Sequence, residues 1–187
     1  MKHFFLFTTL IALMLNIQAQ EHQKSSIAFY NLENLFDTID APRSGDFAWT
    51  PGGDKIWNSQ RYQKKLDNLA NVISNLDNNP NQNGPDILGV CEVENRSVLE
   101  DLIQTKPISN VNYGIIHYNS PDHRGIDVAM LYQKSSFTVE NSQTYTLHFP
   151  GEDYHTRDQL IVSGKLHGEK IHIIVNHWPS RRGGPQK

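Results

Sequence analysis

Asp86-Ile87-Leu88-Gly89-Val90-Cys91 is an almost unbroken apolar stretch, and Glu92 follows it directly. A continuous apolar run of this length, preceded by a turn-forming segment, predicts a central strand that is covered on both faces. An acidic side chain at the end of such a strand needs a partner, because a half-buried carboxylate is costly when it stands alone. A divalent cation could be that partner, and so could Arg96 or Arg124.

Two helices are expected from the sequence. Between residues 59 and 76 five apolar side chains recur at helical spacing, and they are Tyr62, Leu66, Leu69, Ile73 and Leu76. That periodicity predicts an amphipathic helix packed on a sheet. A shorter helix is expected next to Asn95 or Ser97, either of which could be its N-cap.

Strands are expected at the other β-rich runs. These runs are residues 26–31, 113–118, 126–132, 160–166 and 171–176, with a hairpin at 165–170. Residues 37–58 are rich in Asp, Pro, Gly and Trp and predict a long surface loop, a kind of segment that often has a function. Because strands and helices alternate, the chain is predicted to be one α/β domain.

Composition narrows the class of protein. The 187 residues are 37% hydrophobic, 20% charged and 10% aromatic, as in ordinary soluble globular chains. The net charge of -3 argues against a protein that holds nucleic acid mainly by a strong positive field. A phosphate-rich substrate would therefore need positive charge close to its binding site, from a cation or from a few arginines. Cys91 is the only cysteine, so the chain cannot form an internal disulfide.

The N-terminus predicts export. Lys2 and His3 precede the apolar residues 4–17, and the small residue Ala19 follows them. This pattern predicts a secretory signal peptide at residues 1–19, then a polar leader at 20–25, and a periplasmic or extracellular protein. An uncleaved membrane anchor is disfavoured, because the run is shorter than the ~20 apolar residues of a spanning helix.

Two further polar residues stand at the ends of apolar strands. Asn31 follows the first strand, and His177 follows the last one within Asn176-His177-Trp178-Pro179-Ser180. An amide oxygen suits a hard cation, and a histidine can donate to a phosphoryl oxygen or transfer a proton near neutral pH. Structural roles stay open, since Asn31 could close a turn and His177 could bond to a loop carbonyl. Arg157 precedes another strand, where it could brace Asp158 or clamp a phosphate.

Four motifs occur in a specific order along the chain. They are residues 29–37 (FYNLENLFD), 85–95 (PDILGVCEVEN), 124–129 (RGIDVA) and 176–180 (NHWPS). In order and spacing these motifs resemble the endonuclease/exonuclease/phosphatase family, the family of DNase I, exonuclease III and the sphingomyelinases. The resemblance covers residues 26–187 and is closest to exported bacterial members.

The resemblance implies an αββα sandwich, with two packed mixed sheets, helices outside and the site at one rim. It implies that Glu92 binds Mg²⁺ or Mn²⁺, with Asn31 beside the metal and the phosphate. His177 is similar to the histidine that hydrogen-bonds the scissile phosphate, and Arg157 is similar to the arginine that precedes that part of the sheet, which makes both residues candidates for a catalytic role. Arg124 is implied as a substrate contact.

Asn176 is also expected to contact the substrate, whereas Glu94 is expected to lie behind the ligands or on the surface. The implied activity is metal-dependent hydrolysis of phosphoester bonds, by an exported nuclease or phosphodiesterase that acts on nucleic acid or nucleotides. The resemblance implies no protein partner. A phosphatase, a sphingomyelinase-like enzyme and a non-catalytic remnant that binds metal or phosphate are the alternatives. The family's late Ser-Asp-His and Gly-Asp-x-Asn segments are missing, so the sequence is expected to be an incomplete N-terminal part, inactive alone.

Overall fold

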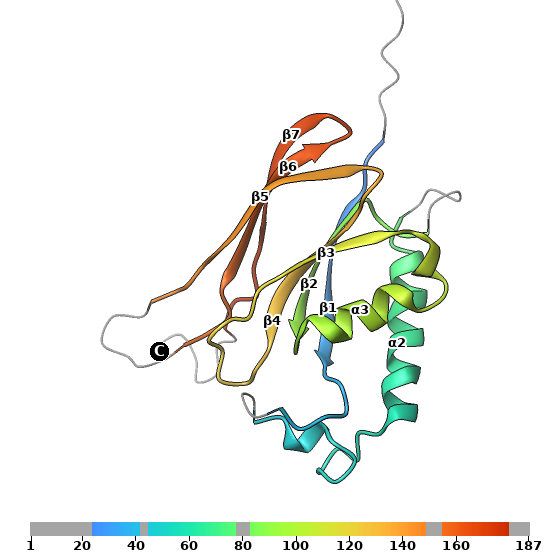
Figure 1. Ribbon diagram of the computed structural model, residues 1–187, viewed down its shortest axis with the longest axis vertical. Coiled ribbons are helices and arrows are strands. Elements are labelled where there is room, and N and C mark those ends of the chain that lie inside the picture. The colour runs from blue at the N-terminus through green and yellow to red at the C-terminus, as the bar shows by residue number, and fades with distance from the viewer. Residues whose placement is uncertain (1–23, 42–44, 78–82, 149–154, 180–187) are drawn as a thin grey trace, which may run out of the picture.

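The computed structural model describes residues 24–41, 45–77, 83–148 and 155–179, which form two sheets and a helical layer (Figure 1). The four-stranded sheet has the order β1-β2-β4-β3, with β1 parallel to β2 and the other pairs antiparallel. Its strands are β1 (Ile27–Leu35), β2 (Ile87–Val93), β3 (Tyr113–His117) and β4 (Asp127–Gln133). The second sheet is antiparallel, in the order β5 (Phe137–Tyr145), β6 (Gln159–Leu166) and β7 (Glu169–Val175).

Both expected helices are present on one face of the four-stranded sheet. They are α2 (Ser59–Ser74) and α3 (Arg96–Gln104), and short 3-10 turns lie at η1 (Phe47–Trp49) and η2 (Ile108–Asn110). Asn58 caps α2 by accepting a bond from the Arg61 amide at 3.0 Å. Asn95 caps α3 by accepting from the Val98 amide at 3.1 Å, which decides between the two expected caps.

Strand β2 lies between two hydrophobic cores. Leu88 and Val90 pack on the helix side, and Ile87 and Cys91 pack toward the second sheet; all four are buried. The prediction of a central strand covered on both faces is therefore confirmed. In the helical layer the buried residues of α2 are Leu66, Leu69, Ala70 and Ile73.

The layers are helices, sheet and sheet, so the expected αββα sandwich is confirmed in three of its four layers (Figure 1). No helix among the described residues covers the outer face of the three-stranded sheet, where the side chain of Ile174 is 57% exposed. None of the described helices is long and apolar enough to cross a membrane.

Strand β5 was not expected from the sequence. Its residues, FTVENSQTY, are mostly polar, and after Phe137 nearly all of them are exposed or half-buried. As an edge strand with little buried surface, β5 lacks the apolar pattern that marks a strand. The other strands lie where they were expected, with shifted ends, and β1 extends four residues further.

The long loop at residues 37–58 is packed by aromatic side chains. Trp49 stacks on Phe36 with ring centroids 5.2 Å apart and meets Trp57 edge to face at 5.4 Å. The Trp57 indole donates to the Phe36 carbonyl at 3.0 Å. The Lys65 ammonium lies 6.0 Å from the Trp49 ring and 5.8 Å from the Trp57 ring. These contacts anchor the loop at the end of β1 and on α2.

Candidate active site

The site residues expected from the sequence gather at one rim of the sandwich. β1 and β2 end at this rim and β4 begins there, as their pairing requires. In the second sheet β6 begins and β7 ends at the same side, because Arg157 and His177 contact residues of the first sheet and its loops. Five strand ends therefore bring together residues that are far apart in the sequence (Figure 1).

Glu92 lies in a bulge within β2, not after the strand as expected. The register shifts between Cys91 and Val93, and Glu92 itself has a left-handed backbone with φ of 62°. A bulge re-aims a side chain, and a left-handed non-glycine residue is strained, so both features are typical of functional positions. The Glu92 Oε1 atom lies 3.5 Å from His177 Nε2, and the two side chains are 14% and 19% exposed. A carboxylate and an imidazole therefore share an accessible rim.

Asn31 is the register partner of Cys91, one residue before Glu92. Its Oδ1 accepts a 2.7 Å bond from the Glu33 amide, and both Glu33 and Asn34 have left-handed backbones. The turn-closing role is therefore confirmed. An amide oxygen has a second lone pair, so this bond leaves Asn31 able to accept a cation or a donor as well.

His177 follows β7 and has an unusual environment. Its Nδ1 is buried and has no hydrogen-bond partner among the described residues, so the expected bond from the ring to a loop carbonyl is not formed. Burial lowers the pKa of the imidazole, and the positive charges of Arg157 and Arg124 lower it further, against the opposing effect of Glu92. His177 is therefore neutral at pH 7, with one ring nitrogen as donor and the other as acceptor.

Arg157 is a buried brace. Its guanidinium donates from Nε to the His177 carbonyl at 3.1 Å, from Nη2 to the Trp178 carbonyl at 2.9 Å and from Nη1 to Asp122 Oδ2 at 3.0 Å. The side chain is only 3% exposed. Its carboxylate partner is Asp122, so the brace to Asp158, one of the two roles left open by the sequence, is not formed. These three bonds fix the main chain on which His177 stands.

Arg124 and Asn176, the expected substrate contacts, lie near the same rim. The Arg124 side chain is 40% exposed, and its Nε is 3.6 Å from Asp122 Oδ1. The Asn176 Oδ1 is buried and has no partner in the described part of the chain. Arg124 can thus carry its charge to a ligand, and Asn176 has an acceptor that a ligand could satisfy.

Glu94 is not on the surface, because it is only 3% exposed. Its Oε2 accepts the Asp37 amide at 2.7 Å. Burial raises the pKa of this carboxyl to about 8, with further contributions from the charges of Asp37 and Asp46. Glu94 is thus a neutral acid at pH 7 that ties the start of the long loop to β2.

Glu94→Gln is expected to stabilise the protein at alkaline pH. Above its ordinary pKa of 4.5 the carboxyl ionises in the unfolded chain, whereas in the fold it stays protonated until about pH 8, so stability falls across that window. Glutamine keeps the acceptor for Asp37 and has no charge to bury. The free energy of unfolding should rise by about 1–3 kcal/mol at pH 8.5 and change little near pH 4.5.

Urea unfolding at both pH values measures this difference. Glu100→Gln is the matched control, because Glu100 is exposed on α3 and its ion pair is with the exposed Arg96, one helical turn before it. A stability change in Glu94→Gln that is the same at both pH values would contradict the assignment.

The residues at the rim fit a Mg²⁺ ion. No group of three or more His, Cys, Asp or Glu side chains in the described ranges could hold a metal by itself. Mg²⁺ does not need such a cage, since it is usually bound by one or two carboxylates together with water and substrate phosphate oxygens. The Glu92 carboxylate and the free lone pair of Asn31 Oδ1, which lie on neighbouring strands, are ligands of that kind.

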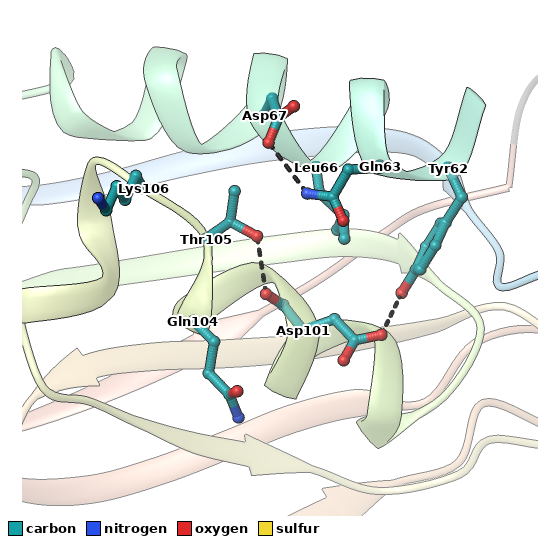
Figure 2. Close-up of a pocket in the computed structure, with 8 residues that line it drawn as sticks. All are labelled: Tyr62, Gln63, Leu66, Asp67, Asp101, Gln104, Thr105 and Lys106. Carbon is teal, nitrogen blue, oxygen red and sulfur yellow. Dashed lines mark hydrogen bonds between the residues drawn. The ribbon is translucent and has the colours of Figure 1, made fainter. Parts of the chain in front are cut away.

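A separate groove lies between α2 and α3, with a volume of about 490 Å³ (Figure 2). Its lining residues are Tyr62, Gln63, Leu66, Asp67, Asp101, Gln104, Thr105 and Lys106. The Tyr62 hydroxyl donates to Asp101 across the groove at 2.8 Å. None of the expected site residues lines this groove, so it is distinct from the rim.

Comparison with known proteins identifies relatives of the chain. The model of the Endonuclease/Exonuclease/phosphatase family matches residues 26–187. No curated protein sequence matches the chain.

Solved structures with a similar backbone include D. rerio TDP2 complexed with single-strand DNA product. It is 17% identical with a TM-score of 0.49, and the match covers 87% of this chain and 49% of that one. Bacteroides thetaiotaomicron mannosyl-6-phosphatase Bt3783 is 17% identical with a TM-score of 0.48, covering 81% and 50%. The endonuclease/exonuclease/phosphatase from Bacteroides vulgatus is 17% identical with a TM-score of 0.45, covering 80% and 51%. The chain thus spans about half the length of these solved structures.

Proposed function

Because the chain belongs to the endonuclease/exonuclease/phosphatase family, we propose that it is part of an exported Mg²⁺-dependent hydrolase of phosphoester bonds. The observation that supports the proposal most is the 3.5 Å distance between Glu92 Oε1 in β2 and His177 Nε2 just after β7, at the edges of two different sheets. A bulge on one side and an arginine brace on the other fix this pair. Such preorganisation of a carboxylate and an imidazole at an accessible rim is typical of a reaction centre.

In this proposal each group has one task. Glu92 and Asn31 would hold Mg²⁺ or Mn²⁺, which when bound would polarise a phosphoryl oxygen and stabilise the leaving group. His177, kept neutral by burial, donates a hydrogen bond to a phosphoryl oxygen. Arg124 opposes the negative charge of the phosphate, and Asn176 orients the substrate.

The proposed substrate is a nucleic acid or a nucleotide. The net charge of -3 does not oppose this, because the cation and Arg124 supply positive charge where the phosphate binds. Among the similar structures, one is complexed with a DNA product and another is a sugar phosphatase, so a substrate panel is the direct test.

Export also stays a proposal, because residues 1–23 lie outside the described part of the structure. The expected mature protein begins at Gln20, after cleavage at Ala19. Mass spectrometry of protein recovered from the periplasm or the medium would establish the N-terminus.

The proposed activity is tested with the full-length protein and a panel of phosphoesters. Bis-p-nitrophenyl phosphate, single- and double-stranded DNA, RNA, nucleotides, sphingomyelin and a sugar phosphate are incubated with Mg²⁺, with Mn²⁺ and with EDTA. Hydrolysis of a phosphodiester that EDTA stops and Mg²⁺ restores is the expected result. A preference for sphingomyelin or for the sugar phosphate would support one of the alternative activities, and no hydrolysis of any substrate would contradict the proposal.

A further inference from the structure

Asp122 lies at the centre of the polar contacts behind the rim. Its Oδ2 accepts from Arg157 at 3.0 Å, and its Oδ1 accepts from the Arg124 amide at 2.9 Å, with the Arg124 Nε 3.6 Å away. The Asp122 side chain has no exposed surface. One buried carboxylate thus faces two arginines, of which one is buried and one reaches solvent.

The Asp122 carboxylate determines where Arg157 stands. A buried guanidinium without a counterion is strongly unfavourable, so the position of the Asp122 carboxylate fixes the position of the Arg157 guanidinium. From that place Arg157 bonds to the carbonyls of His177 and Trp178. A chain of bonds therefore runs from Asp122 through Arg157 to the main chain that carries the imidazole.

Asp122 is itself held in place by its loop. Its amide donates to Ser120 Oγ at 3.4 Å, and Ser120 Oγ donates to the Ile126 carbonyl at 3.2 Å. The Ser120 amide donates to Asp127 Oδ1 at 2.8 Å, and the other oxygen of Asp127 lies 2.9 Å from His117 Nε2. This network of hydrogen bonds between β3 and β4 holds the Asp122 carboxylate in one position, unlike a surface carboxylate that is free to move.

We propose that Asp122 is a positioning residue of the site, which sets His177 through Arg157 and at the same time orients the exposed Arg124. The expected changes in kcat and KM rest on the proposed function, whereas the positions of Arg157 and His177 rest on geometry alone. Partners one step behind a reaction centre typically contribute about 10–100-fold to activity, so Asp122→Asn should lower kcat by that factor. Arg124→Ala should instead raise KM and leave kcat within about threefold, because Arg124 is placed to meet the substrate.

A double variant separates positioning from stability. Asp122→Asn leaves Arg157 buried and unpaired, so its thermal midpoint should fall by several degrees. Adding Arg157→Gln removes the unpaired charge and should restore much of the midpoint. If Asp122 positions His177 through Arg157, the kcat of the double variant equals that of Arg157→Gln alone, measured well below both thermal midpoints. If the two changes instead lower kcat multiplicatively, Asp122 does not act through Arg157 and the inference is overturned.

Amide NMR of the full-length protein tests the geometry without relying on activity. Asp122→Asn and Arg157→Gln are both expected to shift the amide resonances of His177 and Trp178, whereas Asp86→Asn should not. Asp86 is the matched control, a buried carboxylate at the opposite end of β2 that accepts from the Ser26 amide. Unchanged His177 and Trp178 resonances in Asp122→Asn overturn the inference, even if the protein is an active hydrolase. Shifted resonances in a protein that hydrolyses no phosphoester support the positioning and overturn only the proposed function.

Discussion

Glu92→Gln is expected to lower Mg²⁺-dependent phosphoester hydrolysis by at least about a thousandfold. The change replaces the Glu92 carboxylate by a neutral amide of the same shape, so the loss reports the charge and not the packing. A bound Mg²⁺ supplies several kcal/mol of transition-state stabilisation, and about 4 kcal/mol corresponds to a thousandfold in rate. The kcat/KM of the variant with bis-p-nitrophenyl phosphate, at saturating Mg²⁺, measures the effect.

The control for Glu92→Gln is Glu100→Gln on α3, which removes an exposed carboxylate of the surface pair with Arg96. Its activity should equal that of the unchanged protein. Calorimetry with Mg²⁺ alone separates binding from catalysis, because the loss of a ligand should weaken the ion's affinity even without substrate. Activity of Glu92→Gln within about tenfold of the unchanged protein would show that this carboxylate is not the principal metal ligand.

The sequence predicted the elements that depend on local periodicity. The spacing of Leu66, Leu69 and Ile73 predicted α2, and the continuous apolar run before Glu92 predicted a central strand. Both patterns arise because buried faces need apolar residues at the period of the element. Strand β5 was missed for the same reason, since its exposed edge position imposes no apolar period.

Details of the site were less predictable, because they depend on contacts between distant segments. One of the two roles considered for Arg157 was to brace its neighbour Asp158, but the fold brings Asp122, 35 residues away, to 3.0 Å. The bulge that gives Glu92 its left-handed backbone leaves no signal in the residue types. Only the pairing of the strands on either side creates it.

The burial of Glu94 was also undetermined by sequence, although a signal existed. Glu94 directly follows Val93, the buried last residue of β2, and the acidic Asp37 and Asp46 lie in the loop that folds over it. A second acidic residue beside the first reads as a solvated charge unless the loop's own packing is known. The aromatic contacts of Trp49 and Trp57 are what bring that loop back to the strand ends.

His177→Gln is expected to lower kcat by about 100- to 1000-fold, the usual effect of losing a donor that is fixed at a developing oxyanion, because the flexible glutamine amide is not held where the imidazole is. The same change should alter the dependence of kcat on pH. Since burial and Arg157 hold the pKa of His177 below its ordinary value of 6.5, the imidazole takes up its proton in more acidic solution than an ordinary histidine does. If the neutral form is the active one, the acid limb of kcat for the unchanged protein lies below pH 6.5 and is absent from His177→Gln.

The stability of the protein should follow the same titration. As the pH falls below 6.5 the unfolded chain takes up the proton before the folded one does, so this group lowers the free energy of unfolding in acid and has no effect above pH 6.5. His177→Gln should therefore lose that part of the pH dependence in EDTA. His172→Gln is the control, because His172 bonds to Ser163 at 2.7 Å on the exposed face of the second sheet. If kcat falls in acid for His177→Gln just as it does for His172→Gln and for the unchanged protein, this acid limb belongs to another group. The neutral imidazole of His177 is then not the donor.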